Sequence, residues 1–556
     1  MSTLDWLVLA ASLVGIVGYG LYKARGEQTT ESYLLAGRTM RWWVIGLSIM
    51  ATQASAITFI GTTGQGYVDG MRFVQFYFGL PIAMVIIAAF VAPFYHRANI
   101  YTAYEYLEQR FDSKTRTLTS LVFLTQRGLG VGLALYAPAV VLSVIMGWPE
   151  WVTILAMGLL VVTYTVIGGI KAVMWTDAQQ MMIMFSGIFA AFFAAVWGLP
   201  GDVSFGDALY LSGVAGKLRA VDLSFDWENR YNIWSGLIGG TFLALSYFGC
   251  DQSQVQRYLT GRSLAHMRFS LLFNAVVKVP LQFVILLTGA MVFVFFVFQE
   301  SPLLFNKVQL ARMQQPGHTD YQNVEQRYRD ALGARRDAAQ NLLRVESPAA
   351  ENAYLAAEKN VLALRREGIA LVEKSNQGET YNDTNYIFLH FVTRHLPAGL
   401  VGLIMAAVFA AAMSTISAEL NSLASATVID HYRRYIRKNA SDRHYTNISK
   451  AATAFWGLYA TAFASFGGQL GSLIEAVNIV GSFFYGSVLG VFVLAFGPWK
   501  SNGTGAFSGM LAGLAAVAWT SQNTSISFLW YNVVGCLVAV AVGLAISRAA
   551  RPPTVA

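Results

Sequence analysis

Long apolar stretches alternate with short polar loops along almost the whole chain. A membrane-spanning helix needs about 20 mostly apolar residues, and thirteen stretches approach that length: residues 4–22, 42–66, 73–95, 118–146, 151–169, 178–198, 232–250, 271–298, 399–429, 449–467, 472–497, 504–520 and 527–547. The pattern predicts an all-α membrane protein with about 13 transmembrane helices. Because that number is odd, the two termini are expected on opposite sides of the bilayer.

The composition agrees with this prediction. Hydrophobic residues make up 55% of the 556 residues and charged residues 13%, which is about half the charged fraction of an ordinary soluble domain. The net charge of +8 comes from basic residues in short loops, so membrane topology explains it and nucleic-acid binding is not expected. Cys250 and Cys536 lie in or beside apolar stretches and predict neither a disulfide framework nor a metal cluster.

Basic residues are concentrated in alternate loops, most densely between Arg433 and Lys450. Cytoplasmic loops carry the excess of lysine and arginine in multi-pass proteins. We therefore expect a cell-membrane protein with its N-terminus outside and its C-terminus in the cytoplasm.

Residues 305–380 form a charged segment that this topology places outside the membrane. Apolar residues recur at helical spacing within it, and Ser347-Pro348 is typical of a helix start. The sequence predicts a helical hairpin inserted between two membrane parts, residues 1–304 and 381–556. The hairpin could bind a partner or cap an entrance, but a tolerated loop insertion is the simpler interpretation.

The second apolar stretch is interrupted by the small and polar segment Ala51-Thr-Gln-Ala-Ser-Ala-Ile-Thr58. Polar groups at membrane depth need partners in the protein or in an aqueous cavity, so an interrupted span often lines a binding site. The alternative is a helix that packs through small residues and hydroxyl hydrogen bonds. This segment alone does not separate the two interpretations.

A similar segment lies in the ninth apolar stretch, Ala410-Ala-Ala-Met-Ser-Thr-Ile-Ser-Ala-Glu-Leu-Asn-Ser422. Four of its positions are three or four residues apart and approach one helix face: Ala411, Ser414, Thr415 and Ser417. A hard cation prefers oxygen ligands, and neutral carbonyls and hydroxyls release it readily. Carbonyls at the first break and hydroxyls of this face form a candidate site for a monovalent cation, with a packing seam as the alternative.

Three ionisable residues in or beside the apolar stretches are candidates for function. Arg127 lies about 14 Å along a helix from the expected cytoplasmic end, and we expect it to bind a substrate carboxylate or to pair with Asp251 or another acid. Asp177 and Asp251 are expected at the edges of spans, where acids are less often functional. Lys278 lies closer to the cytoplasm and is expected to snorkel.

Four motifs together resemble the sodium/solute symporter family in order and spacing: Ser55-Ala-Ile-Thr-Phe-Ile-Gly61, Gly168-Gly-Ile-Lys-Ala-Val-Met-Trp-Thr-Asp177, Asp251-Gln-Ser-Gln-Val-Gln-Arg-Tyr-Leu259 and Ala410-Ala-Ala-Met-Ser-Thr-Ile-Ser417, followed by Asn421-Ser422. The resemblance covers the chain apart from 305–380. Within the family, the chain is most similar in character to sialic acid or monocarboxylate carriers.

This resemblance implies a LeuT-type fold of two inverted five-helix repeats, here about 42–198 and 232–497, each beginning with a broken helix. It also implies sodium as the coupling ion. The main sodium site would use the carbonyls of Ala51, Ala54 and Ala411 and the hydroxyls of Ser414 and Thr415.

The same resemblance implies further site residues. Asp177 and Ser417 match a second sodium site of some members, although Ala418 stands where those members have another serine. The carboxylate-binding arginine of the carriers would fall one turn after Arg127, where this chain has Gly130. Substrate contacts are expected from Gln53, Ser55, Thr58, Gln75, Tyr77, Arg127 and the Asp251 region.

We therefore expect sodium-coupled symport of a small polar, anionic organic solute by alternating access. The alternative is a membrane sensor of the same fold that uses the outer hairpin as its ligand or partner module. An enzyme is not expected, because the seven histidines have no zinc-site spacing and no phosphate-binding glycine loop with a lysine occurs.

Overall fold

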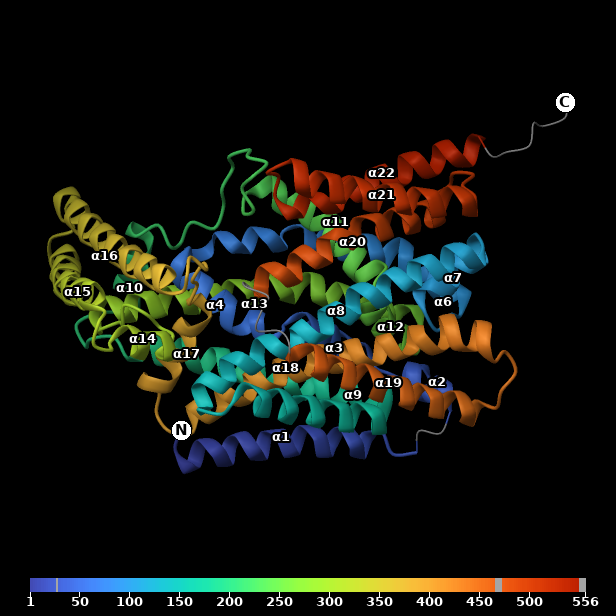
Figure 1. The fold of residues 1–556 in the computed structure, drawn as a ribbon, viewed down its shortest axis with the longest axis horizontal. Coiled ribbons are helices and arrows are strands. Elements are labelled where there is room, and N and C mark those ends of the chain that lie inside the picture. The colour runs from blue at the N-terminus through green and yellow to red at the C-terminus, as the bar shows by residue number, and fades with distance from the viewer. Residues whose placement is uncertain (27–28, 466–472, 550–556) are drawn as a thin grey trace.

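The computed structural model describes residues 1–26, 29–465 and 473–549. Within these ranges the regular elements are all helices, and a single isolated bridge pairs Met40 with Gly261. Figure 1 shows most helices running in one common direction, while α15 and α16 project from one end. This is the arrangement of a membrane bundle with an extramembrane hairpin.

The first part of the chain forms α1 (Thr3–Lys23), α2 (Thr30–Leu35), η1 (Ala36–Arg38), α3 (Trp42–Gln53), α4 (Ala56–Val68), η2 (Gly70–Tyr77), α5 (Gly79–Ile86), η3 (Ile87–Val91), α6 (Ala92–Ala98), α7 (Ala103–Arg110), α8 (Ser113–Met146), α9 (Glu150–Trp197) and α10 (Phe205–Val214). The second part forms η4 (Ser235–Gly239), α11 (Gly240–Gly249), α12 (Gln252–Leu259), α13 (Leu264–Phe298), α14 (Lys307–Met313), α15 (Thr319–Val345), α16 (Pro348–Ser375), α17 (Thr384–His395), α18 (Leu400–Ser425), η5 (Ala426–Ile436), α19 (Asp442–Ser465), α20 (Leu473–Phe496), α21 (Gly503–Asn523) and α22 (Phe528–Ala549).

The predicted spans fall on helices wherever the structure describes them. Among the described residues, seven helices are long and apolar enough to cross a membrane, or eight when the bent pair of α3 and α4 is counted as one span. The other predicted spans lie on helices that are shorter or less apolar, such as Ser235–Gly249 and Gly481–Phe496. The number of thirteen spans therefore stays a prediction, while the all-helical fold class is confirmed.

One difference from the prediction concerns α9, which runs through the expected loop 170–177 without a coil. Its 48 residues would measure about 72 Å as a straight helix, more than twice the thickness of a bilayer core. A break at Gly169, with φ 55° and ψ −157°, divides it into two arms. Only glycine suits this position, since a Cβ would lie 2.5 Å from the Tyr33 carbonyl oxygen.

Two further helices are interrupted at the positions that the polar segments predicted. The chain bends by 60° between α3 and α4, and α11 ends at Gly249 before α12 begins at Gln252. The hydroxyl-rich helix α18 lies deep in the bundle, where it packs against α9, α1, α8, α3 and α4. Both interrupted helices thus lie within the packed membrane part, and α18 contacts the first of them.

The predicted hairpin is present as α15 and α16, joined at Glu346 and Ser347. The Ser347 hydroxyl caps α16 by accepting from the Ala350 amide, with Pro348 in the first helical position. Between the two helices, Arg335 pairs with Glu358 at 3.0 Å. The same guanidinium donates to the Phe296 carbonyl at 2.6 Å, so the hairpin is anchored on the end of α13.

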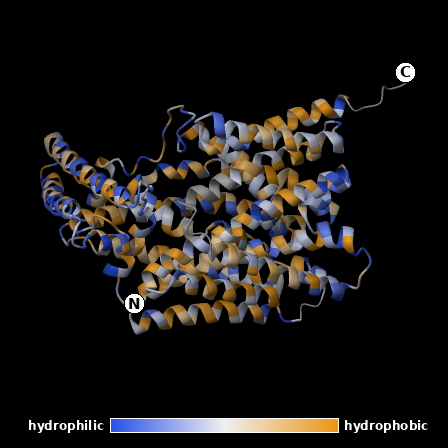
Figure 2. Cartoon of the chain, in the orientation of Figure 1, coloured by the Kyte–Doolittle hydropathy of each residue, from blue (hydrophilic) through white to orange (hydrophobic). Residues whose placement is uncertain are grey.

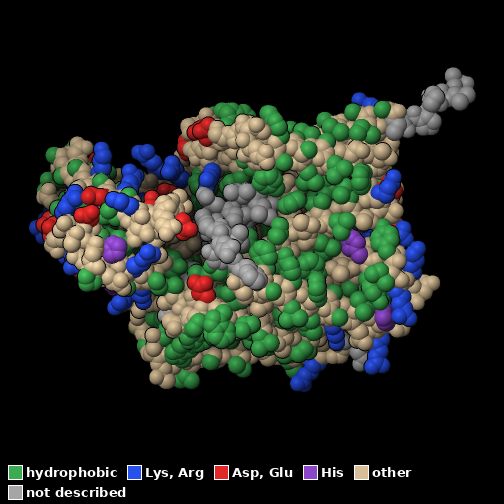
Figure 3. Space-filling model, in the orientation of Figure 1, with side chains coloured by type: hydrophobic (Ala, Val, Ile, Leu, Met, Phe, Trp, Pro, Cys, Tyr) green, Lys and Arg blue, Asp and Glu red, His purple; other side chains and the backbone are tan. Residues whose placement is uncertain are grey.

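The polarity of the surface also differs between the bundle and the hairpin. Figure 2 shows predominantly hydrophobic helices in the bundle and a more hydrophilic hairpin. In Figure 3, hydrophobic side chains cover the flank of the bundle, whereas lysine and arginine gather on the hairpin and at the opposite end. An apolar flank between two charged ends is the surface that a bilayer requires.

Candidate functional site

The break between α3 and α4 frees backbone oxygens in the middle of the bundle. Ala54 leaves the helical conformation with φ −87° and ψ 67°, and Ser55 begins α4 by accepting from the Thr58 amide at 3.2 Å. The last carbonyls of a helix have no partner in their own helix. The final turn of α3, which includes Ala51, therefore offers oxygen ligands at a buried position.

Helix α18 brings a hydroxyl to these carbonyls. Thr415 Oγ1 lies 3.1 Å from the Thr52 carbonyl oxygen and 3.2 Å from that of Ala411. One hydroxyl has a single proton and can donate to only one of two acceptors at a time. Two carbonyl oxygens and one hydroxyl oxygen form a neutral ligand set that suits a monovalent cation such as sodium, and the Thr52 carbonyl is a candidate ligand that the sequence motifs did not indicate.

Ser414, on the same helix, faces a buried aspartate. Its hydroxyl donates to Asp177 Oδ1 at 2.7 Å, while Ser48 donates to Oδ2 at 2.6 Å. The Arg257 guanidinium also contacts Oδ2, at 3.2 Å. Asp177 is fully buried and lies in the second arm of α9, eight residues after the break at Gly169. The residues before it, where a loop was expected, are helical.

The predicted second sodium site is only partly assembled. Ser417 donates to the Ser414 carbonyl at 3.1 Å, and the hydrogen bonds that Asp177 accepts among the described residues come from Ser48, Ser414 and Arg257. Arg257 already places a positive charge beside that carboxylate. Asp177 therefore joins α3, α9, α12 and α18 through ordinary polar contacts.

A cavity of about 210 Å³ lies beside the α3–α4 break. It is lined by Thr52, Gln53, Ser55, Thr58, Phe76, Tyr77, Leu80, Gln126, Arg127, Gly130, Leu133, Ala134, Gly240, Leu243, Ala244, Tyr247, Phe248, Thr415, Glu419, Gly481, Ser482 and Tyr485. Ten of the lining side chains are apolar or aromatic and nine are polar or charged, so the cavity combines apolar walls with polar groups that can orient a small molecule. Thr415 belongs both to this lining and to the candidate cation site.

Five predicted substrate residues line the cavity, and two lie behind it. Gln75 is not among the described lining residues: its amide donates to the Tyr231 carbonyl at 2.9 Å and accepts from the Asp222 amide at 2.8 Å. Asp251 reaches the cavity only through Arg127. Gln75 therefore holds a loop in place, which corrects its predicted contact with the solute.

Arg127 is held by two carboxylates. Its Nε donates to Asp251 Oδ2 at 2.8 Å and its Nη1 to Glu419 Oε1 at 2.9 Å. The remaining Nη2 donates to the Tyr485 hydroxyl at 2.7 Å. Of the two roles expected for Arg127, the structure shows the pair with Asp251. Glu419 was missed because its sequence context marks it only as one acid in an apolar helix.

Lys278 differs from its expected snorkelling position. The residue is fully buried, and its Nζ has no hydrogen-bond partner among the described residues. The ammonium lies 5.5 Å from the centre of the Tyr77 ring. Lys278 thus faces the interior beside a residue of the cavity.

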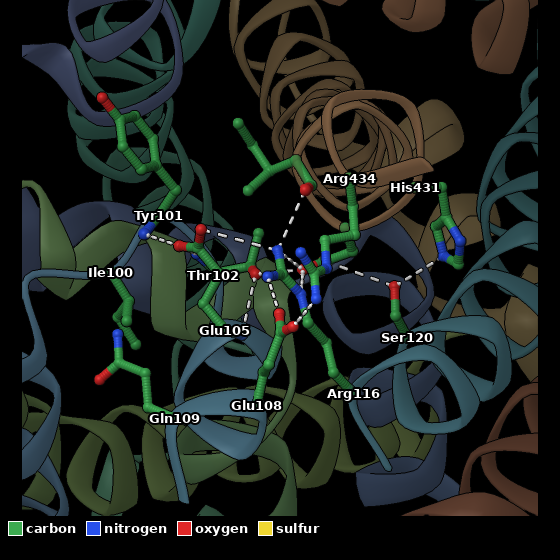
Figure 4. Close-up of polar contacts among 12 residues, drawn as sticks. Ile100, Tyr101, Thr102, Glu105, Glu108, Gln109, Arg116, Ser120, His431 and Arg434 are labelled. Carbon is green, nitrogen blue, oxygen red and sulfur yellow. Dashed lines mark hydrogen bonds and ion pairs between the residues drawn. The ribbon is translucent and has the colours of Figure 1, made fainter. Parts of the chain in front are cut away.

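The end of the bundle opposite the hairpin is fastened by a polar cluster, shown in Figure 4. Arg116 donates from Nε to Asp430 Oδ1 at 2.8 Å and from Nη1 to Glu108 Oε2 at 2.7 Å. Thr102 also donates to Asp430, at 2.8 Å, and Arg434 contacts Glu108. These contacts join α7 and the start of α8 to η5, the continuation of α18.

Comparison with known proteins accounts for this arrangement. A model of the "Sodium:solute symporter family" matches residues 33–301 and 361–513, which is most of the chain. The unmatched interval 302–360 covers α14, α15 and the first turns of α16.

Curated relatives match almost the whole chain. The chain is 27% identical over 525 residues to "Sodium-coupled monocarboxylate transporter 1" of Xenopus laevis, covering 94% of this chain and 72% of the relative. It is 26% identical over 546 residues to "Sodium/sialic acid symporter NanT" of Aliivibrio fischeri, covering 97% and 92%.

A solved structure described as a substrate-bound outward-open state of a Na⁺-coupled sialic acid symporter has the same fold, with a TM-score of 0.77. It is 24% identical to this chain and each covers 99% of the other. The match of the family model, supported by the broken helices and the shared fold, shows that this chain belongs to the sodium:solute symporter family and is a multi-pass, sodium-coupled symporter with a LeuT-type fold, not an enzyme.

Proposed function

We propose that sodium binds where α18 meets the broken end of α3. The ligands would be the carbonyls of Ala51, Ala54 and Ala411 and the hydroxyls of Ser414 and Thr415, with the Thr52 carbonyl as a further candidate. The observation that supports this site is the position of Thr415 Oγ1 between the Thr52 and Ala411 carbonyls. A cation there would be coordinated by oxygens that already lie 3.1 and 3.2 Å from the Thr415 hydroxyl.

Sodium bound at this place explains coupling in physical terms. It would join α3 to α18, and a ligand shifts a conformational equilibrium when it binds one state more tightly than the other. Alternating access follows if the conformation in which sodium joins α3 to α18 is also the one in which all the lining residues of the cavity can contact the solute. Asp177 and Ser417 then have a structural role in this proposal, with Arg257 supplying the positive charge.

The solute would be a small polar organic molecule held in the cavity beside the break. Gln53, Ser55 and Thr58 offer polar groups from the broken helix, and Tyr77 forms part of the opposite lining. The sequence predicted an anionic solute, but the donors of Arg127 are already engaged by Asp251 and Glu419. A direct carboxylate contact with Arg127 is therefore not part of the proposal.

We also propose that the hairpin lies outside the cell and the cluster around Arg116 on the cytoplasmic side. In Figure 1, α1 begins near the hairpin and α22 ends at the opposite end, in agreement with termini on different sides. The rival function, a sensor with the hairpin as a partner module, predicts a second protein that binds α15 and α16. The anchoring of Arg335 on α13 favours a brace for the outer ends of the membrane helices.

Uptake into proteoliposomes tests the proposal. A panel of radiolabelled small polar solutes is offered with an inward sodium gradient and, in parallel, with an equal potassium gradient. Accumulation that requires sodium is expected for at least one solute class, and it should be lost in the Ser414→Ala/Thr415→Ala double variant. Sodium-driven uptake that persists in this variant would place the ion elsewhere.

A further inference from the structure

We infer that Glu419 selects a solute that carries a protonated amine. This inference rests on the proposed solute cavity and names the chemical group that the cavity takes. Glu419 lies on α18, one helical turn from Thr415, and both residues line the cavity. Its side chain is 5% exposed, so a group bound there would be largely removed from water.

The two oxygens of this carboxylate differ in their contacts. Oε1 accepts from Arg127 Nη1 at 2.9 Å, whereas Oε2 is buried and has no hydrogen-bond partner among the described residues. Leaving a buried charged acceptor unpaired is costly. A donor supplied by the solute would remove that cost.

The charges of the cavity favour a positive donor. The single guanidinium of Arg127 faces two carboxylates, those of Asp251 and Glu419, at 2.7 and 2.9 Å. With both carboxylates ionised, this cluster of described residues has an excess of one negative charge. Lys278 is fully buried beside Tyr77 and is not among the residues that line the cavity.

Open space beside Gly130 adjoins Glu419, and the cavity lining contains a second unpaired acceptor. A Cβ on Gly130 would approach no heavy atom closer than Glu419 Oε1, at 4.0 Å. Gln53 Oε1, which is buried and unpaired among the described residues, belongs to the same lining. An ammonium has three donors and is attracted by aromatic faces, and the cavity offers the rings of Tyr77, Phe76 and Phe248.

A solute carboxylate would fit this place poorly. The Arg127 donors already point to Asp251, Glu419 and Tyr485, and an incoming anion would meet Glu419 as a like charge. The same arrangement that neutralises the arginine therefore excludes an anionic group from this part of the cavity.

The test uses the purified full-length protein and a panel of small amines, amino acids and amino sugars, each beside its hydroxyl counterpart. L-alanine with L-lactate and D-glucosamine with D-glucose are two such pairs. Thermal stability is measured for each solute in sodium and in potassium, because a ligand specific for the folded state raises apparent stability. We expect sodium-dependent stabilisation by at least one amine, with an affinity about tenfold or more higher than that of its hydroxyl counterpart.

Two variants complete the test. Glu419→Gln keeps the size of the side chain and leaves Asp251 to neutralise Arg127, and it should reduce the amine preference to about twofold or less. Glu419→Asp keeps the charge and should retain part of the preference. Stabilisation by sodium alone reports that each variant is folded.

The outcomes separate this inference from the proposed function. Sodium-dependent stabilisation by hydroxyl or carboxylate members alone, or an amine preference that survives in Glu419→Gln, would overturn the inference and leave symport intact. Absence of any sodium-dependent effect across the panel would overturn the proposed function as well.

Discussion

Replacing Thr415 by valine gives a direct test of the sodium site. Valine has nearly the shape of threonine but no hydroxyl, so the change removes one oxygen that contacts the Thr52 and Ala411 carbonyls at 3.1 and 3.2 Å. As a hydrogen bond, this hydroxyl contributes about 1 kcal/mol to stability. As one of about five ligands for the ion, it should contribute at least about tenfold to sodium affinity, which is about 1.4 kcal/mol.

These two effects are separable by titrating thermal stability with sodium. A bound ion stabilises the folded state by RT ln(1 + [Na⁺]/Kd). At a sodium concentration ten times the wild-type Kd, this amounts to about 1.4 kcal/mol, and a tenfold weaker site reduces it to about 0.4 kcal/mol. Thr415→Val should therefore lose about 1.0 kcal/mol of the sodium-dependent stabilisation, in addition to the loss of about 1 kcal/mol that it also shows in potassium.

Two controls make the result specific. Thr415→Ser keeps the oxygen and should keep most of the sodium response. Ser422 is a buried serine on the same helix whose hydroxyl donates to the Glu419 carbonyl at 2.9 Å, so Ser422→Ala removes a comparable hydrogen bond away from the ion. If Thr415→Val responds to sodium as Ser422→Ala does, the reasoning is refuted.

Three further changes test the fold around the site. Gly169→Ala should lower the unfolding midpoint by an amount that corresponds to about 1–3 kcal/mol, since φ is 55° and the Tyr33 carbonyl leaves no room for a Cβ; an unchanged midpoint would contradict this. Arg335→Ala leaves Glu358 buried without its partner and should lower the free energy of unfolding, measured with denaturant, by about 3–5 kcal/mol. Arg327 is exposed, so Arg327→Ala should have little effect. Burial, together with the neighbouring His395, lowers the pKa of His390 to about 4. Between pH 6.5 and 4 the unfolded state therefore binds one more proton than the folded state, and stability falls as the pH is lowered. His390→Gln should flatten this pH dependence of stability, and an equally steep profile in the variant would refute the prediction.

The sequence predicted those parts of the site that depend on local chemistry. A polar segment inside an apolar span identifies a break, and the Ala54–Ser55 break is found where the sequence predicts it. The hydroxyl face of α18 follows from helical spacing alone, and Thr415 indeed meets the broken end of α3. These features need no knowledge of which helices become neighbours.

The remaining contacts depend on how distant helices pack. Arg127 and Glu419 are 292 residues apart, and periodicity does not show that their faces meet. Asp177 was expected at a span edge because an apolar run ends before it, whereas one glycine with positive φ lets α9 continue without a loop. Gln75 was expected to face the solute, but its amide and carbonyl match the loop backbone at Tyr231 and Asp222.

The proposed ion and solute sites share one helix turn, and this proximity suggests how coupling arises. Thr415 and Glu419 are four residues apart on α18, about 6 Å along the axis, and both line the cavity beside the broken helix. An ion at Thr415 would join α3 to α18, while an amine between Glu419 and Gln53 would bridge the same two helices. Each ligand would thus stabilise the helix arrangement that the other requires, so the coupling free energy must be equal in both directions. The sodium site would then tighten solute binding without a direct contact between the two ligands, because the rigid α18 turn transmits the effect.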